Sequence, residues 1–293
     1  MSADKRPIVP DSSLPDPPVF EGKKPLLKPD PESATMPLLA HLSELRQRLT
    51  RIVIVILLGF IACYSIAQPA YDFLSAPLVA ALPAGSTLIY TKPHGAFFVY
   101  LRVSVLASFF LTSPVSFYQI WAFIAPGLYK EEKRFIVPLA FLSALFFFIG
   151  AAFCYILVFP VAFKFFMGFA TDFIVPMISV EEYLSFALKL LLAFGLVFEM
   201  PLFAFFLAKM GLLTPEFMRA KRSYASLVLI IAAAVLTPPD VFSQIMMFIP
   251  MMILYEFSIF VAAWARKDRD AKKEKNKKVE DATKNEEREH AES

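Results

Sequence analysis

The sequence predicts an all-α fold: a polytopic membrane protein with six transmembrane helices and both termini in the cytoplasm. Two observations predict this class. The chain is 57% hydrophobic, and its apolar residues gather in six long runs. Lys and Arg crowd onto every second connection between those runs. A helix needs about 20 apolar residues to cross a bilayer core of roughly 30 Å, and all but one of the runs reach that length.

The apolar runs are the expected spans, taken in chain order. They lie at residues 52–71, 96–118, 135–159, 183–208, 223–236 and 241–265. The fifth run holds only 14 residues. At ~1.5 Å per residue it extends ~21 Å, which is less than the hydrocarbon thickness. We therefore expect a locally thinned bilayer, or shielding by protein, around the fifth span.

The positions of the cations predict the orientation. Cations precede the first run, fill the second and fourth connections and follow the sixth run: Arg46, Arg48, Arg51, Lys130, Lys133, Arg134, Lys209, Arg219, Lys221, Arg222, Arg266, Lys267 and Arg269. The other connections are poor in cations. The positive-inside rule places the cation-rich segments, and with them both termini, in the cytoplasm.

Composition divides the chain into three regions. Residues 1–35 hold many prolines and no apolar core, so we expect a disordered cytoplasmic arm without a cleavable signal peptide. Residues 36–265 form the six-helix core. Residues 266–293 are mostly charged and form a cytoplasmic tail, whose basic start can hold the last helix against anionic lipid. Cys63 and Cys154 lack CxxC spacing, and we expect both to be small buried side chains.

Local patterns predict the segments that border the spans. Leucines at helical spacing from Leu38 to Leu49 indicate an amphipathic helix on the cytoplasmic surface. Glu44 and Arg48 lie four residues apart within it, so a plain surface ion pair is one interpretation of both. In the first outer loop, Pro77 interrupts an apolar face and predicts a short, kinked helix along the interface.

Two polar residues have the chemistry of helix caps. Thr214 precedes Pro215 and is expected to cap a helix that begins there. Asp240 follows two prolines and is expected to cap the sixth span.

Four ionisable residues fall inside the apolar runs. Arg102, Lys189 and Glu256 lie near span ends, and we expect structural roles for them. Glu199 lies deep in the fourth span, two residues before Pro201, which is expected to bend the helix. An isolated carboxylate there is costly, so it should face other helices or a wet cavity. A functional cavity and a hydrogen-bonded carboxyl at a helix contact remain open alternatives.

The chain lacks the common motifs of catalysis. No GxxxxGK[ST], GxGxxG, HExxH or GxSxG occurs, and the three histidines lie outside the expected membrane core. A metal site or a Ser–His protease therefore lacks its parts. We expect no cofactor, no nucleic-acid partner and no enzymatic activity.

Five longer segments carry a more specific signal. They are His41–Leu49, Ser75–Leu78, Tyr118–Arg134, Phe198–Pro201 and Leu236–Gln244. In this order, and within a six-span layout over about residues 36–265, they closely resemble the TatC family of the twin-arginine protein translocase. The resemblance implies a multi-pass protein of the bacterial cytoplasmic (inner) membrane. It would bind signal peptides with two adjacent arginines and export folded proteins.

The resemblance also implies partners and a signal-peptide site. The partners would be small single-span subunits of the TatA and TatB type, together with further copies of the chain and membrane lipid. By motif position, the signal-peptide site would comprise Glu44, Glu132, Arg46 and Phe123, and Pro77 would be important in the first outer loop.

The same resemblance assigns four further positions. Glu199 matches the intramembrane Glu of the family's concave face. Asp240, Gln244 and Thr237 lie where partner helices would dock. The long Pro-rich arm and Lys189 depart from the family pattern.

The position of two carboxylates agrees with the implied site. Glu44 precedes the first span by eight residues, and Glu132 precedes the third by three. Both spans start on the predicted cytoplasmic side, so the two carboxylates lie near one membrane level. Two arginines presented there could be held by bidentate contacts.

A secondary transporter is the main alternative, with Glu199 as its proton or ion site. Such proteins usually show paired broken helices and internal repeats. Pro201 and Pro250 lie in possible counterpart spans, but the sequence shows no convincing repeat. Binding of a folded precursor rather than a small solute would separate the two functions.

Overall fold

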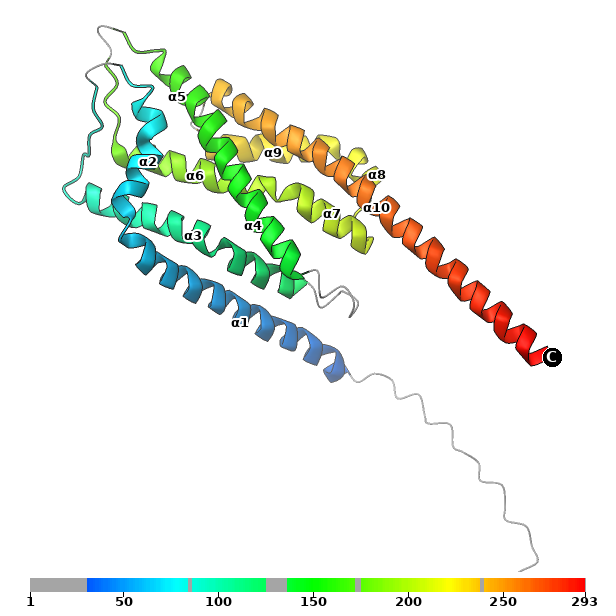
Figure 1. Cartoon of the computed structure of the whole chain (residues 1–293). Helices are drawn as coiled ribbons and strands as arrows, with labels where there is room; N and C mark the ends of the chain where they lie inside the picture. Colours follow the sequence, from blue (N-terminus) through cyan, green and yellow to red (C-terminus); the bar gives the residue numbers. More distant parts are fainter. Residues whose placement is uncertain (1–30, 84–85, 125–135, 172–174, 238–239, 293) are drawn as a thin grey trace, which may run out of the picture. The chain divides into compact units, whose positions relative to one another are not determined.

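A computed structural model describes residues 31–83, 86–124, 136–171, 175–237 and 240–292 (Figure 1). These residues are helical apart from short connections and an isolated β-bridge between Ile89 and Ser179, so the all-α prediction is confirmed. Packing divides the chain into residues 1–43 and 44–293, and the contacts described below belong to the second unit.

The helices follow one another closely along the chain. They are α1 (Pro31–Tyr64), α2 (Ala67–Val79), α3 (Gly95–Ile124), α4 (Ile136–Phe153), the π-helical turn η3 (Cys154–Val158), α5 (Phe159–Met167), α6 (Val180–Phe198), α7 (Met200–Met210), α8 (Pro215–Ala220), α9 (Arg222–Leu236) and α10 (Val241–Glu292).

The first apolar run does not form one helix, and its predicted end at residue 71 is wrong. Helix α1 stops at Tyr64, and α2 begins at Ala67. Pro69 has no N–H, so the carbonyl of Ser65 would lose its partner in a continuous helix. The chain turns instead, and the Ser65 hydroxyl donates to the Ala62 carbonyl at 2.8 Å.

Five helical stretches of the described chain are long and apolar enough to cross a membrane. They cover residues 42–64, 95–124, 136–167, 180–210 and 241–271. Each overlaps a predicted span. Helix α9, the fifth predicted span, is apolar but has only 15 residues, which gives it a length of ~22 Å. The count of six spans and the cytoplasmic placement of the termini therefore stay predictions.

Two of these stretches are interrupted. The stretch 136–167 contains the five-residue π-helical turn η3. The stretch 180–210 changes from α6 to α7 at Glu199, because Pro201 lies in the first turn of α7 and cannot donate to the carbonyl of Val197. The helix is thus interrupted where the sequence predicts a bend.

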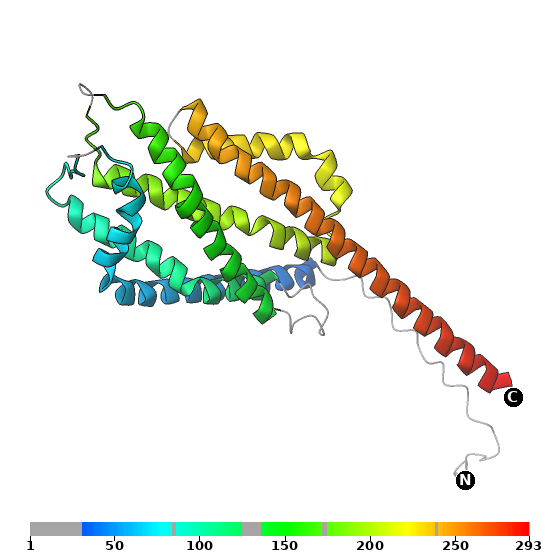
Figure 2. The same ribbon diagram turned by 45° about the horizontal axis from the view of Figure 1, so that its top comes forward.

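Helix α4 packs against both α3 and α6, and Figure 2 shows it running across them. The crossing with α6 is close because both helices carry glycine there. A β-carbon added to Gly150 would lie 2.5 Å from the carbonyl oxygen of Phe194. One added to Gly195 would lie 2.5 Å from the ring of Phe147. Small residues allow this approach of backbones inside a membrane.

Helix α1 meets α3 through a similar small-residue contact. A β-carbon on Gly59 would lie 2.8 Å from the Thr112 methyl group and 3.3 Å from Ser108. Both α3 hydroxyls are turned back onto their own helix, where Thr112 donates to the Ser108 carbonyl at 2.7 Å. Only 11% of the apolar stretch of α1 is buried, so little of it packs against the rest of the described chain.

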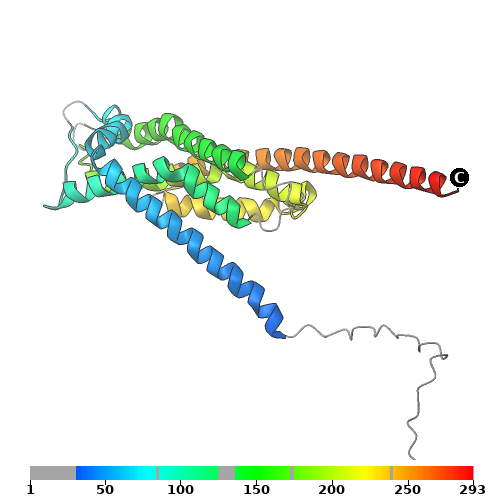
Figure 3. The ribbon, with the colours of Figure 1, turned by 60° about the horizontal axis from the view of Figure 1, so that its bottom comes forward.

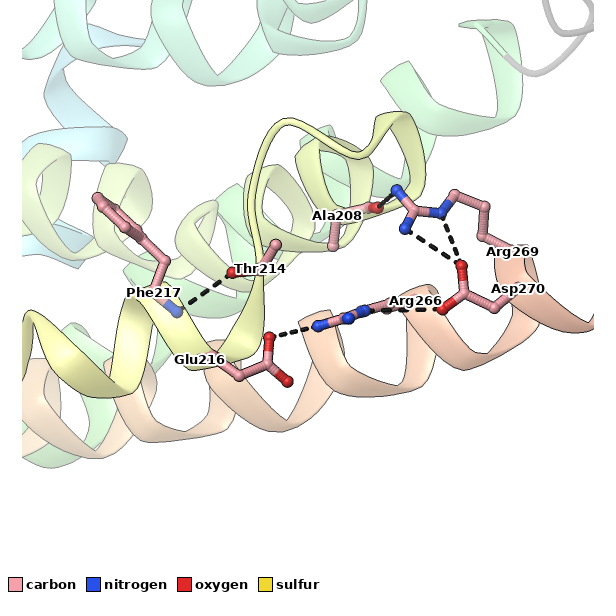
Figure 4. Close-up of polar contacts among 7 residues, drawn as sticks. All are labelled: Ala208, Thr214, Glu216, Phe217, Arg266, Arg269 and Asp270. Carbon is pink, nitrogen blue, oxygen red and sulfur yellow. Dashed lines mark hydrogen bonds and ion pairs between the residues drawn. The ribbon is translucent and has the colours of Figure 1, made fainter.

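Helix α10 packs along α7 and α9 and then continues through the charged tail to Glu292 (Figure 3). The start of that tail is fixed by ion pairs (Figure 4). Arg266 pairs with Glu216 of α8 and, at 3.6 Å, with Asp270. A hydrogen bond from its own backbone N–H, together with Arg266, holds the pKa of Glu216 below its ordinary value.

The same segment of α10 contacts the C-terminal end of α7. Gly211 has a left-handed φ of 85° and ends the helix. Arg269 lies directly against Gly211 and donates to the Ala208 carbonyl at 3.4 Å (Figure 4). The Thr214 hydroxyl accepts from the backbone N–H of Phe217 at 3.2 Å, so the predicted cap of α8 is confirmed.

Candidate functional site

Helices α1 and α3 meet in a polar contact built around Arg48. Its guanidinium donates from Nε at 3.0 Å and from Nη2 at 2.6 Å to Oε1 of Glu44. Its Nη1 donates to the side-chain oxygen of Gln119 on α3 at 3.3 Å. The ion pair that the spacing of Glu44 and Arg48 predicts is therefore present. It also ties α1 to the end of α3.

The geometry leaves part of the Glu44 carboxylate available. The two Arg48 nitrogens that donate to Glu44 bind the same oxygen, and Oε2 accepts no hydrogen bond among the described residues. The Glu44 side chain is 36% exposed, against 20% for Arg48. A second guanidinium could therefore reach Oε2 without displacing the first.

The other residues of the predicted signal-peptide site have different surroundings. Phe123 lies one helical turn after Gln119 on α3 and is partly buried. Arg46 is exposed on α1. Glu132 lies outside the described residues, so the pairing of Glu44 with Glu132 stays a prediction. Gln119 was not predicted as part of the site, although it stands in the segment that begins at Tyr118.

Pro77 has a defined partner in the structure. Because proline has no N–H, the carbonyl of Phe73, four residues earlier in α2, has no helical donor. The Tyr155 hydroxyl of η3 supplies one at 2.7 Å, and the rings of Tyr155 and Phe73 stack with centroids 4.5 Å apart. The Tyr183 hydroxyl of α6 donates to the next carbonyl, that of Leu74. Pro77 thus frees an acceptor that fixes α2 to the core.

This arrangement predicts coupling between Pro77 and Tyr155. Tyr155→Phe should lower the free energy of unfolding by about 1 kcal/mol, because the Phe73 carbonyl then has no donor. In a Pro77→Ala background the residue at position 77 donates to that carbonyl, so Tyr155→Phe should cost much less. Thermal unfolding of the two single variants and the double variant in detergent measures the coupling. Additive effects would contradict this role of Pro77.

Glu199 lies at a helix contact. Its side chain is 2% exposed, and neither carboxyl oxygen makes a hydrogen bond in the described part of the chain. Ser143 of α4 lies near the carboxyl but does not form a hydrogen bond with it. The Ser143 hydroxyl instead accepts a hydrogen bond from Trp121 Nε1 at 2.7 Å. Trp121 in turn stacks on Phe203 of α7. The burial agrees with a carboxyl packed between helices.

The three residues expected to dock partner helices all have contacts within the chain. Asp240 caps α10 as predicted, because it accepts from the Ser243 N–H at 2.7 Å. The buried Thr237 hydroxyl donates to the Ala233 carbonyl at 2.9 Å. Gln244 donates from Nε2 to the Ile230 carbonyl of α9 at 3.2 Å.

The side-chain oxygen of Gln244 is available to accept a hydrogen bond from another molecule. Its amide oxygen accepts no hydrogen bond among the described residues, and its side chain is partly exposed.

The remaining ionisable residues inside the spans divide into two groups. Glu256 pairs with Arg222 of α9 at 2.5 Å, and Arg102 donates to the Ser185 hydroxyl of α6 at 3.0 Å. Both residues thus have a polar partner within the chain, and the structural roles stay predictions. Lys189 is exposed and has no hydrogen bond or ion pair among the described residues.

Comparisons with known proteins give one consistent result. Residues 40–250 match the family described as "Sec-independent protein translocase protein (TatC)". The chain is 49% identical to the protein of that name from Desulforapulum autotrophicum, over 83% of this chain and 90% of the relative. It is 43% identical to that of Escherichia coli strain K12, over 77% and 88%.

A solved structure gives the same match. The crystal structure titled "Twin Arginine Translocase Receptor- TatC" superposes with a TM-score of 0.71 at 40% identity. The match covers 77% of this chain and 99% of that one.

Proposed function

Because the chain belongs to the TatC family of Sec-independent protein translocase proteins, we propose that it is the receptor core of a twin-arginine translocase. It is a translocase subunit and a multi-pass protein of the bacterial inner membrane. In the proposed function it binds twin-arginine signal peptides on the cytoplasmic side. It then exports the folded proteins that carry them, together with TatA- and TatB-type subunits.

The partly exposed carboxylate of Glu44 is the observation that carries this proposal. It already binds one guanidinium, that of Arg48, through a single oxygen, and its second oxygen is available. A signal-peptide arginine would bind that oxygen. Its neighbour in the peptide would bind Glu132 in the connection between α3 and α4, and Phe123 and Arg46 would border the site.

Photo-crosslinking of a signal peptide tests the function directly. A peptide with two adjacent arginines should crosslink to membranes carrying this chain, at positions near Glu44 on α1 and near the end of α3. A twin-lysine peptide should crosslink much less, because Lys cannot supply the planar fork of a guanidinium. Equal labelling by both peptides would remove the basis of the proposal.

The proposed orientation has six spans and cytoplasmic termini, with α9 as the short fifth span. Single cysteines near residues 90, 175 and 239 should react with an impermeant thiol reagent added outside the cell. Cysteines near residues 130, 215 and 270 should react only after the membrane is opened, because the cation-rich connections stay inside. External labelling at residue 130 would overturn this orientation.

Partner helices are proposed to dock beside the start of α10, where Asp240, Gln244 and Thr237 lie. The amide oxygen of Gln244 would accept a hydrogen bond from a polar side chain of the partner helix. Such bonds between membrane helices contribute about 0.6–2 kcal/mol.

Gln244→Leu should therefore weaken crosslinking to a TatA- or TatB-type helix by roughly three- to thirtyfold and leave signal-peptide crosslinking intact. Because this variant also loses the bond to the Ile230 carbonyl, Gln244→Lys serves as the matched control. Its ammonium can still donate to that carbonyl but supplies no acceptor, so it should show the same defect. Normal partner crosslinking in both variants would count against the site.

The transporter alternative lacks a specific observation in its favour. It needs Glu199 to meet an ion or a wet cavity, whereas the Glu199 side chain is 2% exposed between packed helices.

A further inference from the structure

A polar groove of about 490 Å³ lies between the N-terminal parts of α3 and α6 and the end of α9. Its charged lining consists of Lys92, Arg102, Glu181, Glu182 and Lys189. None of these five forms an ion pair with another among the described residues. The groove also includes apolar side chains of α6 and α9.

The charges in the groove are ordered along the helices. Glu182, Ser185 and Lys189 follow one another at helical spacing on one face of α6, and Glu182 is in its first turn. Lys189 lies seven residues further on, ~10 Å deeper along the axis. Arg102 donates to the Ser185 hydroxyl at 3.0 Å, so its guanidinium also lies below the carboxylates. The acidic groups are therefore at the mouth and two cations are deeper.

Glu181 and Glu182 differ in their surroundings. The Glu181 carboxylate lies against Gly95 at the start of α3, where a helix N-terminus favours a negative charge. Glu182 is exposed and has no described partner. Lys92, near the same mouth, forms no described ion pair either. Glu182 is thus the acidic group that is left for a ligand.

The deeper cations also require a counter-ion. Arg102 and Lys189 are both exposed within apolar spans, and their only described polar contact is the neutral Ser185 hydroxyl. A cation at this depth is costly unless an anion or water reaches it. An anionic group that enters the groove from the membrane would supply the counter-ion.

We propose that this groove binds the headgroup of phosphatidylethanolamine. The phosphate of this lipid lies closer to the acyl chains than its primary ammonium group does. In the groove, the phosphate accepts hydrogen bonds from Arg102 and Lys189, and the ammonium group donates to Glu182. The apolar residues Val235 and Leu236 border the same groove and contact the acyl chains. On the proposed orientation this is a lipid of the outer leaflet.

The order of the charges favours this lipid over other anionic ligands. A carboxylate on a partner helix would match the two cations but would leave Glu182 unpaired and repel it. Phosphatidylglycerol supplies a phosphate without an ammonium group. Phosphatidylcholine supplies a quaternary ammonium that has no N–H to donate to Glu182.

Lipid binding to the purified, delipidated full-length chain in detergent tests the proposal. Native mass spectrometry with each of the three lipids gives the dissociation constants. Phosphatidylethanolamine should bind about tenfold more tightly than the other two, equivalent to one charge-assisted hydrogen bond. Lys189→Gln should weaken its binding about tenfold. Lys164→Gln, which removes a cation of α5 outside the groove, should have no effect.

Glu182→Gln gives the sharpest result, since it should abolish the preference for phosphatidylethanolamine over phosphatidylcholine and strengthen phosphatidylglycerol binding. If Lys189→Gln does not fold, Arg102→Gln carries the same expectation. Three results would overturn the proposal: equal affinity for the three lipids, tighter binding of phosphatidylglycerol to the unmodified chain, or tighter binding of a membrane-spanning peptide with one carboxylate. None of these measurements depends on signal-peptide binding, so the proposed function can stand or fail separately.

Discussion

The double variant Glu44→Gln, Glu132→Gln is expected to lose affinity for a twin-arginine signal peptide by a factor of about 100 to 10,000. In the proposed site each carboxylate binds one guanidinium, and each charge-assisted hydrogen bond contributes about 1.5–3 kcal/mol. Each single variant should therefore weaken binding by roughly ten- to a hundredfold. Glutamine keeps the size and polarity of the side chain, so the fold should survive. Quantitative peptide crosslinking to the four proteins measures the effect.

Arg48 provides the control for this experiment. Glu44→Gln also breaks the pair of Glu44 with Arg48, a partly exposed contact of small expected energy. Arg48→Gln breaks the same pair but keeps the carboxylate and removes its resident guanidinium. This variant should bind the peptide at least as well as the unmodified chain. If Arg48→Gln loses peptide binding to the same extent as Glu44→Gln, the ion pair between the two residues, and not the carboxylate alone, is required for binding. If the double carboxylate variant binds normally, the site assignment is wrong.

Gly150→Ala is expected to lower the free energy of unfolding by about 1–3 kcal/mol. The added β-carbon would meet the Phe194 carbonyl oxygen at 2.5 Å and the β-carbon of Phe198 at 2.9 Å. Neither atom is the far end of a flexible side chain, so α4 and α6 would have to move apart. Thermal unfolding in detergent measures the loss.

Two other glycines make the comparison specific. Gly168→Ala is the matched control, because its nearest neighbours lie at 3.2 and 3.4 Å at the end of α5. It should be close to neutral. Gly195→Ala meets the ring of Phe147, a side chain rather than backbone, and it should fall between the two. A Gly150→Ala protein as stable as the Gly168→Ala protein would show that the crossing of α4 and α6 is looser than described.

Residue patterns predicted those features that depend on neighbours in the sequence. The caps at Thr214 and Asp240 and the pair of Glu44 with Arg48 are all set by spacings of three or four residues, and all three are present. The end of the first span was missed because hydropathy does not distinguish α1 from the apolar start of α2. The missing N–H of Pro69 is the signal that could have placed the break.

Contacts between distant segments could not be predicted in the same way. Arg48 reaches Gln119 only because Gly59 lets α1 lie close to α3. Tyr155 reaches the Phe73 carbonyl only because α2 packs beside η3. In a membrane protein, lipid-facing and protein-facing surfaces are both apolar. Apolar periodicity therefore does not identify the partner of each helix face.

The small buried share of α1 has a consequence for biosynthesis. Because so little of α1 is buried against other helices, packing contributes little to its stability. Its own backbone hydrogen bonds and the contact of its apolar surface with the bilayer stabilise it instead. It is also made before α3, so it can insert and persist before α3 is complete. Docking is then a separate, later step. Gly59 and Arg48 set the register in which the finished helix meets the rest of the chain.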